Sequence, residues 1–465
     1  MNSEAGVGNL LEEAKAIIGD QETGIRDGIV KSIYDTSEYI TKEVVSYTSV
    51  NRVDWDRKID NIITSPIWGF PIMFGVLAVV FWVTITGANY PSEFLATQLF
   101  WVQGKLTELF MALGAPGWLH GFLVLGVYTS LAWVVSVLLP PMAIFFPLFT
   151  LLEDAGYLPR VAFNLDRLFK KAGAHGKQAL TMSMGFGCNA AGVIACRIIE
   201  SPRERLIATL TNNFVPCNGR FPTIIALVSL FVAGSVSVTL GSLIATLGVA
   251  GMVVFGIAVT LFVSWLLSKT LLKGEPSSFT LELPPYRKPQ VGQVLIRSVM
   301  DRTIFVLSRA VVIAAPAGGL VWIMANTTTG DTTILAATAN WLEPFAGLMG
   351  LDGYILMAFI LGLPANEIVF PILIMSYVSG DTMVQMESLA DLHHLLIDQH
   401  GWTWLTGLCT VIFALCHWPC GTTLFTIQKE QQNWRWTLLA AVIPAGIGII
   451  ICIIITTLAR ALNLV

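Results

Sequence analysis

The chain has 465 residues, of which 54% are hydrophobic and 12% charged, and its formal net charge is -4. The mean hydropathy is +0.69, and the charged fraction is about half of the ~25% found in soluble domains. This composition excludes an ordinary soluble domain and indicates a membrane protein with several spans. No basic block suggests nucleic-acid binding.

Residues 1–62 are polar, and apolar residues recur among the charges at roughly helical spacing, as at Ile25, Ile29 and Ile33. This pattern predicts a short cytosolic arm of amphipathic helix. The arm either lies on the membrane or its own protein, or docks a cytosolic partner. It lacks the short apolar run of a signal peptide, so none is expected.

Apolar runs long enough to cross a bilayer, which needs about 20 residues, dominate the rest of the chain. They lie at 66–86, 119–152, 178–196, 206–268, 303–325, 353–378, 403–427 and 436–459. The predicted organisation is a first transmembrane helix with an outer segment at 63–118, a first repeat at 119–268, a cytosolic linker at 269–302 and a second repeat at 303–465. Lysines and arginines gather in the arm and the linker, which predicts a cytoplasmic N-terminus in a cell membrane.

Gly or Pro interrupts the apolar runs at matched places in the two repeats. Gly185-Phe-Gly-Cys-Asn189 resembles Gly362-Leu-Pro-Ala-Asn366, and Val215-Pro-Cys217 resembles Trp418-Pro-Cys420. Loop charges indicate that the first hairpin enters from the cytoplasm and the second from outside. This is the pattern of inverted repeats with re-entrant hairpins and broken helices that meet at the midplane of a transporter. The alternative is that glycine only allows close helix packing.

Polar side chains at these breaks are candidates for a solute pathway. Glu367 lies in an otherwise uncharged apolar segment, where a charge costs roughly 2.5–3.5 kcal/mol on insertion scales. It is therefore expected to bind a metal ion or carry a proton, unless it is a protonated group bonded to a neighbouring helix. Thiolates and imidazole suit ions such as Fe(II) or Zn(II). The candidate metal ligands are Cys188, Cys217, Cys420, Glu367 and His417.

Each of these assignments has a structural alternative, since a buried cysteine also packs as a small apolar side chain. That interpretation applies outright to Cys196, Cys409 and Cys452. All seven cysteines lie in apolar segments, so free thiols are expected rather than disulfides. Asn189, Asn218 and Asn366 either offer oxygen to a cation or satisfy backbone groups at the breaks.

Two further sets of charged groups lie near the pathway candidates. Arg220 is the cation within its break and is expected to pair with a carboxylate or carbonyl groups, because a positive charge repels a metal ion. An outer segment carries acidic and imidazole groups that either gather cations or are simply solvated. These groups are Asp391, His393, His394, Asp398 and His400.

No P-loop, His-Glu-x-x-His or Gly-x-Ser-x-Gly motif occurs in the chain. We therefore expect no enzyme and no permanently bound cofactor, with the divalent metal as transported substrate.

Several long motifs resemble the membrane portion of the ferrous iron transport protein B (FeoB) family. The resemblance covers about residues 50–460 and includes its two Gate (nucleoside-recognition-type) regions. The motifs are Leu151-Leu-Glu-Asp-Ala-Gly-Tyr-Leu-Pro-Arg160, His175-Gly-Lys177, Gly185-Phe-Gly-Cys-Asn189, Glu200-Ser-Pro-Arg-Glu-Arg205, Pro216-Cys217, Gly274-Glu-Pro-Ser277, Glu282-Leu-Pro-Pro-Tyr-Arg287 and Trp418-Pro-Cys420.

The resemblance implies an all-α polytopic membrane protein with two inverted Gate repeats, acting as a permease for ferrous iron. It also implies that the three cysteines at the breaks line the pathway, and that Glu153 and Asp154 form an inner exit site or cap an interfacial helix. Family members usually begin with a GTP-binding domain, whereas here about 60 residues without a P-loop precede the first span. A separate cytosolic GTPase, small accessory proteins, membrane lipid and a second copy of the chain are the expected partners.

The chain departs from the family at the pathway itself. Ala190-Ala191 stands where a proline is typical, Asn366-Glu367 where Lys-Glu is common, and His417-Trp418 where Tyr-Thr is common. Another divalent metal therefore stays possible as substrate. A carrier of nucleosides or another organic solute, and a non-transporting scaffold for a GTPase, are the alternatives.

Overall fold

The structure is a computed structural model of the chain and describes residues 22–45, 55–233, 238–274, 285–329, 332–378 and 389–464. Almost all regular structure in these ranges is helical, which confirms the predicted all-α class. The exception is a two-stranded antiparallel hairpin, in which β1 (Thr328–Thr329) pairs with β2 (Thr332–Thr333). Parts of the predicted arm and linker, including most of Gly274–Ser277 and Glu282-Leu-Pro, lie outside the described residues.

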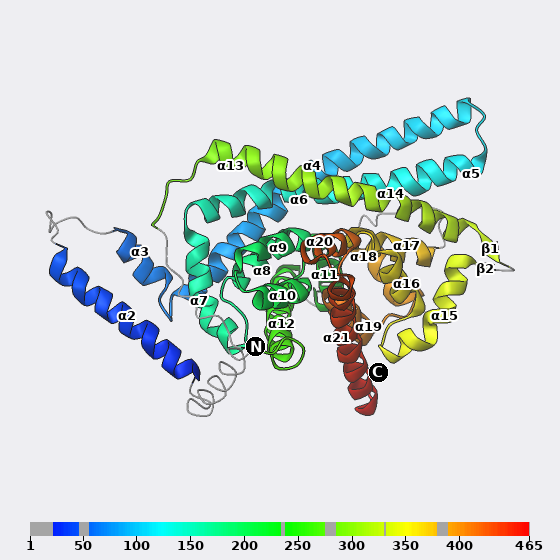
Figure 1. Cartoon of the computed structure of the whole chain (residues 1–465). Coiled ribbons are helices and arrows are strands. Elements are labelled where there is room, and N and C mark those ends of the chain that lie inside the picture. The colour runs from blue at the N-terminus through cyan, green and yellow to red at the C-terminus, as the bar shows by residue number, and fades with distance from the viewer. Residues whose placement is uncertain are drawn as a thin grey trace, which may run out of the picture.

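The N-terminal part consists of one helix of 23 residues, one short helix and one very long helix (Figure 1). They are α2 (Glu22–Val44), α3 (Trp55–Ile63) and α4 (Gly69–Ala112). At about 1.5 Å per residue, the 44 residues of α4 extend about 66 Å. Figure 1 shows the C-terminal part of α4 and the region of α5 (Gly117–His120) as a hairpin that projects from the rest of the molecule. The apolar run predicted at 66–86 is therefore only part of a longer helix.

The first half of the remaining chain contains long helices at its ends and short segments between them. These are α5 (Gly117–His120), η2 (Gly121–Tyr128), α6 (Thr129–Asp154), α7 (Tyr157–Lys171), α8 (Gln178–Gly187), α9 (Asn189–Ala195), η3 (Cys196–Ile198), α10 (Pro202–Thr211), η4 (Asn212–Phe214), α11 (Phe221–Val228), η5 (Ser229–Ala233) and α12 (Val238–Lys269).

The second half shows a similar alternation. Its elements are α13 (Val291–Arg297), η6 (Ser298–Ile304), α14 (Phe305–Asn326), α15 (Ile334–Leu348), α16 (Gly353–Leu361), η7 (Asn366–Ile368), α17 (Val369–Val378), α18 (Leu389–His393), η8 (His394–Gln399), α19 (Trp404–Cys416), α20 (Gly421–Gln431) and α21 (Trp434–Ala461).

Six helical stretches within the described ranges are long and apolar enough to cross a membrane, and a bent pair adds a seventh. The six are Gly69–Ala112, Gly117–Asp154, Leu247–Lys269, Leu307–Asn326, Trp404–Gln431 and Trp434–Ala461. The bent pair, Ile334–Leu348 with Gly353–Leu361, turns by 109°. The chain is a multi-pass membrane protein.

One continuous apolar core joins the two halves. It extends from Phe146 of α6 through Leu210 and Ile224 to Phe413 of α19 and Cys452 of α21. Polar N-caps define where helices in this core begin: the Asp352 carboxylate accepts from the Ile355 amide at 2.7 Å, and Thr403 Oγ1 accepts from the Thr406 amide at 3.3 Å. Such caps satisfy backbone N–H groups that a helix start leaves without partners. These caps fix the starts of α16 and α19.

A buried arginine ties the N-terminal part to the linker. The guanidinium of Arg160 donates to both oxygens of Asp60, with Nε–Oδ1 at 2.9 Å and Nη2–Oδ2 at 3.1 Å. It also lies 4.0 Å from the centre of the Tyr286 ring, and the Tyr286 hydroxyl donates to Asp60 at 2.8 Å. Arg160 donates to the Gly156 carbonyl as well. This Asp60–Arg160–Tyr286 cluster holds α3, α7 and the linker together.

Candidate functional site

Four interruptions of helical structure meet in the middle of the molecule. Two lie in the first half, at Cys188 and at 215–220, and two in the second, at 362–365 and 417–420. Cys188 is extended, with φ -155° and ψ 126°, and Ala365 at the matched place has φ -151° and ψ 119°. The helices therefore end where the Gly and Pro residues predict. The two matched breaks also share one backbone conformation.

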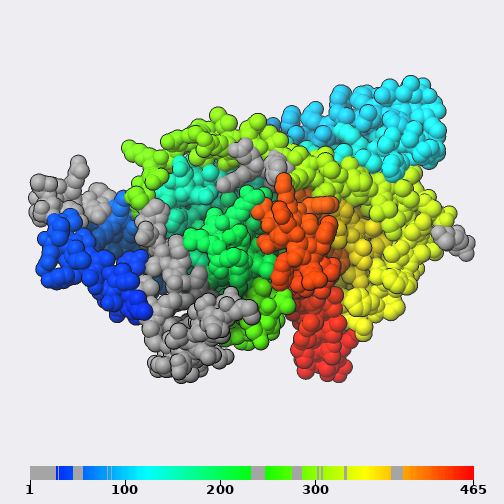
Figure 2. All heavy atoms as spheres, in the orientation of Figure 1, coloured from blue at the N-terminus to red at the C-terminus, as the bar shows by residue number. Residues whose placement is uncertain are grey.

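Hydrogen bonds connect the breaks to one another. The Asn218 amide donates to the Gly187 carbonyl at 3.4 Å within the first half, and the Gly421 amide donates to the Leu363 carbonyl at 2.7 Å within the second. Figure 2 shows the green region near residue 200 and the orange region near residue 420 side by side, where α9 packs on α20. The breaks thus form one structural unit.

A small cavity of about 30 Å³ lies between the four breaks, here named the break cavity. A single water occupies ~10–15 Å³ on this measure, so the break cavity has room for about two waters or one ion. Six of the ten predicted site residues line it: Cys188, Asn189, Cys217, Asn366, Glu367 and Cys420. Segments up to 232 residues apart in the chain thus bring their polar groups to one place.

Glu367 packs against a glycine of the opposite half. A Cβ atom on Gly219 would lie 2.5 Å from Cδ of Glu367 and 3.0 Å from its Cγ, inside the 3.4 Å at which ordinary contacts begin. A side chain at position 219 would therefore force this carboxyl group to move. Gly219, Met142, Thr422 and Thr423 also line the break cavity, and the sequence interpretation missed them. Thr422 and Thr423 directly follow the Pro-Cys-Gly break, which could have indicated them.

The three thiols differ in their surroundings. Cys188 and Cys420 are partly accessible and Cys217 is buried. Cys420 Sγ lies 3.3 Å from Thr423 Oγ1, and Cys217 Sγ lies 4.0 Å from Asn366 Nδ2. Across the described ranges, no group of three or more His, Cys, Asp or Glu side chains is arranged to hold a metal ion.

His417 lies beside the break cavity without lining it. Its Nδ1 faces the carbonyl oxygens of Ala414, at 2.8 Å, and Phe413, at 3.1 Å, so this nitrogen carries a proton. Its Nε2 lies 3.3 Å from Asn366 Oδ1. A neutral ring with its proton on Nδ1 has no proton on Nε2 to donate to this oxygen, so the buried imidazole packs beside Asn366 without holding it by a hydrogen bond.

Arg220 connects the breaks of the two halves. Its guanidinium donates to the carbonyl oxygens of Asn213, at 2.7 Å, and Leu415, at 2.8 Å. It also donates to the carbonyl oxygens of His417 and Trp418 and to Asn213 Oδ1. Interrupted helices leave carbonyl groups without helical partners, and Arg220 satisfies them. The expectation that it pairs with carbonyl groups is confirmed.

The asparagines at the breaks also serve the backbone. In the orientation that satisfies its amide, Asn189 donates to the carbonyl oxygens of Gly185, at 3.1 Å, and Val215, at 3.2 Å. Asn212 donates to the Asn189 carbonyl at 3.0 Å. Asn218 contributes its backbone amide, as described above, and its side chain does not line the break cavity.

Glu153 and Asp154 lie elsewhere, at the end of α6. They line a separate cavity of about 680 Å³ together with Arg287 and Arg297. Asp154 Oδ2 accepts from the Gln290 amide at 2.9 Å, next to the start of α13. The structure therefore does not bring these two carboxylates to the break cavity.

The outer acidic and imidazole groups are also remote from the break cavity. His393, His394, Asp398 and His400 lie in α18, η8 and the turn after them, and all are exposed. His393 Nδ1 lies 3.8 Å from Asp398, and the His400 ring stacks on Tyr377 at 4.1 Å. Asp381 and Glu387 of the same segment lie outside the described residues.

Comparison with known proteins agrees with this architecture. The family described as "Nucleoside recognition" (Gate) matches residues 135–231 and 307–434, so its two matched segments contain all four breaks. The family described as "Ferrous iron transport protein B C terminus" matches residues 249–301, between them. The chain therefore resembles the ferrous iron transport protein B family across these regions.

Curated relatives of this family align with most of the chain. The "Fe(2+) transporter FeoB" of Staphylococcus aureus (strain MSSA476) is 28% identical over 88% of this chain and 60% of its own length. The "Fe(2+) transporter FeoB" of Methanocaldococcus jannaschii is 26% identical over 98% of this chain and 65% of its own length. The chain thus spans less than two thirds of the length of these relatives. No solved structure matches it.

Proposed function

We propose that the chain is a permease for divalent metal ions, with ferrous iron as the substrate, in the cell membrane with its N-terminus in the cytoplasm. The observation that carries this proposal is the break cavity, where three thiols and one carboxyl group from both halves converge. Sulfur and carboxylate ligands together suit Fe(II), whereas Mg(II) and Ca(II) prefer oxygen alone. Relatives that carry the name "Fe(2+) transporter FeoB" support the same substrate.

The proposed route passes between the two hairpin breaks. Conduction requires binding that is weak enough for the ion to leave and that is shared among several sites. We therefore propose that Cys188, Cys217, Cys420 and Glu367 contact the ion in turn. Asn366 and the Thr423 hydroxyl, which both line the break cavity, would add oxygen ligands along the way.

The similarity between the two hairpin breaks supports our proposal of two inverted Gate repeats, at 119–268 and 303–465. Cys188 and Ala365 share one backbone conformation, and both hairpin breaks open on the break cavity. Single cysteines introduced at the two hairpin bases and probed with a membrane-impermeant thiol reagent test this topology. Labelling of both hairpin bases from the same side would contradict it.

We also propose that a cytosolic GTPase and small accessory proteins work with this permease. One relative, from Porphyromonas gingivalis, is named as an "Fe(2+) transport protein A/Fe(2+) transporter FeoB fusion protein", which supports an accessory partner. Co-purification of the chain with these candidates from the native host tests the association.

A nucleoside is the alternative substrate, because the matching family is described as "Nucleoside recognition". The break cavity of about 30 Å³ favours an ion, since pockets for small organic molecules measure ~300–1,000 Å³. Uptake of radiolabelled Fe(II) and uridine into proteoliposomes without oxygen discriminates between the two. Uridine uptake without Fe(II) uptake would contradict the metal proposal.

The pathway residues are tested with a triple variant, Cys188→Ala with Cys217→Ala and Cys420→Ala. We expect Fe(II) uptake to fall at least about tenfold, which corresponds to ~1.4 kcal/mol. The matched control changes three buried cysteines outside the break cavity, Cys196, Cys409 and Cys452, to alanine. Equal uptake by the two triple variants would refute the assignment.

A further inference from the structure

One wall of the break cavity comes from helices that continue past it. Leu138 and Met142 of α6 and Ala310 of α14 line the cavity, and both helices are unbroken at these positions. Backbone groups within a helix pair with one another, so this wall presents side chains to the cavity. Leucine and alanine side chains contain only carbon and hydrogen. Of these three residues, only Met142 therefore offers an atom that can bind a metal ion, its thioether sulfur.

Met142 is held at the cavity by the surrounding protein. Its side chain is 1% exposed, so it is packed inside the molecule. The break cavity measures about 30 Å³, and a volume that holds about two waters leaves an ion close to every wall. Met142 is therefore a neighbour of any ion that enters the break cavity.

The thioether differs chemically from the other candidate ligands. Cysteine and glutamate side chains can lose a proton and become negative, and negative charge attracts every divalent cation. A thioether stays neutral, and as a soft ligand it favours softer ions, whereas carboxylate and carbonyl oxygen suit Mg(II), Ca(II) and Mn(II). It thus adds discrimination without adding charge. This suits a conduction site, where the ion must also be able to leave.

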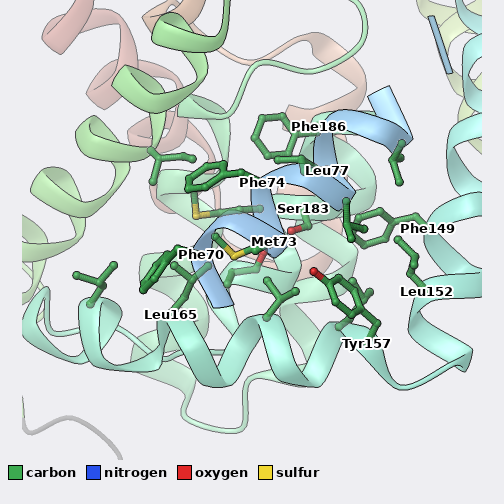
Figure 3. Close-up of a pocket in the computed structure, with 18 of the residues that line it drawn as sticks. Phe70, Met73, Phe74, Leu77, Phe149, Leu152, Tyr157, Leu165, Ser183 and Phe186 are labelled. Atoms are coloured by element: carbon green, nitrogen blue, oxygen red, sulfur yellow. Dashed lines mark hydrogen bonds between the residues drawn. The ribbon is translucent and has the colours of Figure 1, made fainter. Parts of the chain in front are cut away.

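Methionines in another cavity provide a contrast. A cavity of about 270 Å³ lies between α4, α6, α7, α8 and α12, and apart from Tyr157 and Ser183 its lining is apolar, with Met73 and Met182 included. Figure 3 shows Met73 of α4 among aromatic and aliphatic side chains. Among the described residues that line this cavity, none is Cys, His, Asp or Glu. Methionine there fills space as an adaptable apolar side chain, whereas Met142 shares its cavity with three thiols and a carboxyl group.

We propose that Met142 determines which divalent metals the permease prefers. Its thioether contacts the ion in the break cavity and favours softer ions over Mn(II) and Mg(II). This inference rests on the proposed metal transport. It extends that proposal by assigning discrimination among divalent metals to α6, a helix outside the four breaks.

Met142→Leu tests the proposal, because leucine has a similar volume and lacks sulfur, and volume-conserving exchanges are tolerated best in a core. Radiolabelled Fe(II) uptake into proteoliposomes without oxygen is measured in competition with Cd(II), a soft ion, and with Mn(II), a hard one. The readout is the ratio of the Cd(II) concentration to the Mn(II) concentration that halves Fe(II) uptake. We expect Met142→Leu to raise this ratio at least about threefold, which corresponds to ~0.7 kcal/mol.

Met182→Leu is the matched control, because Met182 is 4% exposed and lines the apolar cavity instead. We expect it to keep the wild-type ratio. Equal ratios for Met142→Leu and Met182→Leu would overturn the assignment of selectivity to Met142 while leaving iron transport intact. Wild-type vesicles that take up no Fe(II) would instead refute the proposed function.

A binding measurement tests the contact without transport. X-ray absorption at the cadmium edge counts the sulfur neighbours of Cd(II) bound to the purified full chain. We expect the same count for wild type and Met182→Leu and a lower count for Met142→Leu. An unchanged count in Met142→Leu would overturn the proposed contact between the thioether and the ion.

Discussion

Alanine at position 219 is expected to displace Glu367 from the break cavity. The new Cβ would lie 2.5 Å from Cδ of Glu367, far inside the 3.4 Å of an ordinary contact. Overpacking of this kind costs ~1–3 kcal/mol. Glu367 belongs to a helix break and not to a flexible surface segment, so moving its carboxyl group displaces a proposed metal ligand. We therefore expect Fe(II) uptake to fall together with this loss of stability.

The assay is a double-mutant cycle of unfolding free energies in mixed micelles. If the methyl group acts through the carboxyl group, Gly219→Ala costs little once Glu367 is alanine, and the coupling amounts to ~1–3 kcal/mol. Gly251→Ala is the matched control, because no atom lies within 4 Å of a Cβ built there. Additive losses in the cycle, or a Gly219→Ala chain as stable as Gly251→Ala, would refute the packing argument.

Three further predictions concern the arginines. Arg220→Ala leaves several buried carbonyl groups without donors. We therefore expect its unfolding free energy, measured in mixed micelles, to fall by at least ~3 kcal/mol. Arg197→Ala removes the pair between the exposed Arg197 and the largely buried Glu430 side chain and should cost less than Arg220→Ala, on the order of 1 kcal/mol, in the same assay. The Arg160 guanidinium beside Asp60 holds the pKa of that carboxyl below its usual value. Asp60 therefore stabilises the fold above its unfolded pKa of about 3.9 and loses this contribution as the pH falls through its lower folded pKa. Thermal melting of wild type and Asp60→Asn should converge only below about pH 4, and convergence near neutral pH would contradict the cluster.

The breaks were predictable because their cause is local. Proline lacks an amide hydrogen, and glycine tolerates conformations that end a helix. α8 accordingly ends at Gly187, and α19 ends at Cys416, before His417 and Pro419. The resemblance to the ferrous iron transport protein B family could also be predicted, because its motifs are continuous stretches of sequence. The inverted arrangement of the repeats stays a prediction.

The partners of individual side chains were not predictable. Asp60 and Arg160 are 100 residues apart in the chain, and no local pattern connects them. The His417 ring was predicted as a possible ligand, whereas its Nδ1 faces two backbone carbonyl groups of its own helix. Glu153 and Asp154 were grouped with the pathway, whereas they line a different cavity.

The sequence by itself determined that this is a helical membrane protein, where its helices break, and which polar residues those breaks carry. These properties depend on hydropathy and on backbone restrictions of single residues, so they are encoded position by position. Only the tertiary structure decided that Gly219 faces Glu367, that Arg220 satisfies the carbonyl groups of both halves, and that Tyr157 enters an apolar cavity. Those contacts join distant segments, and packing of the whole chain selects them.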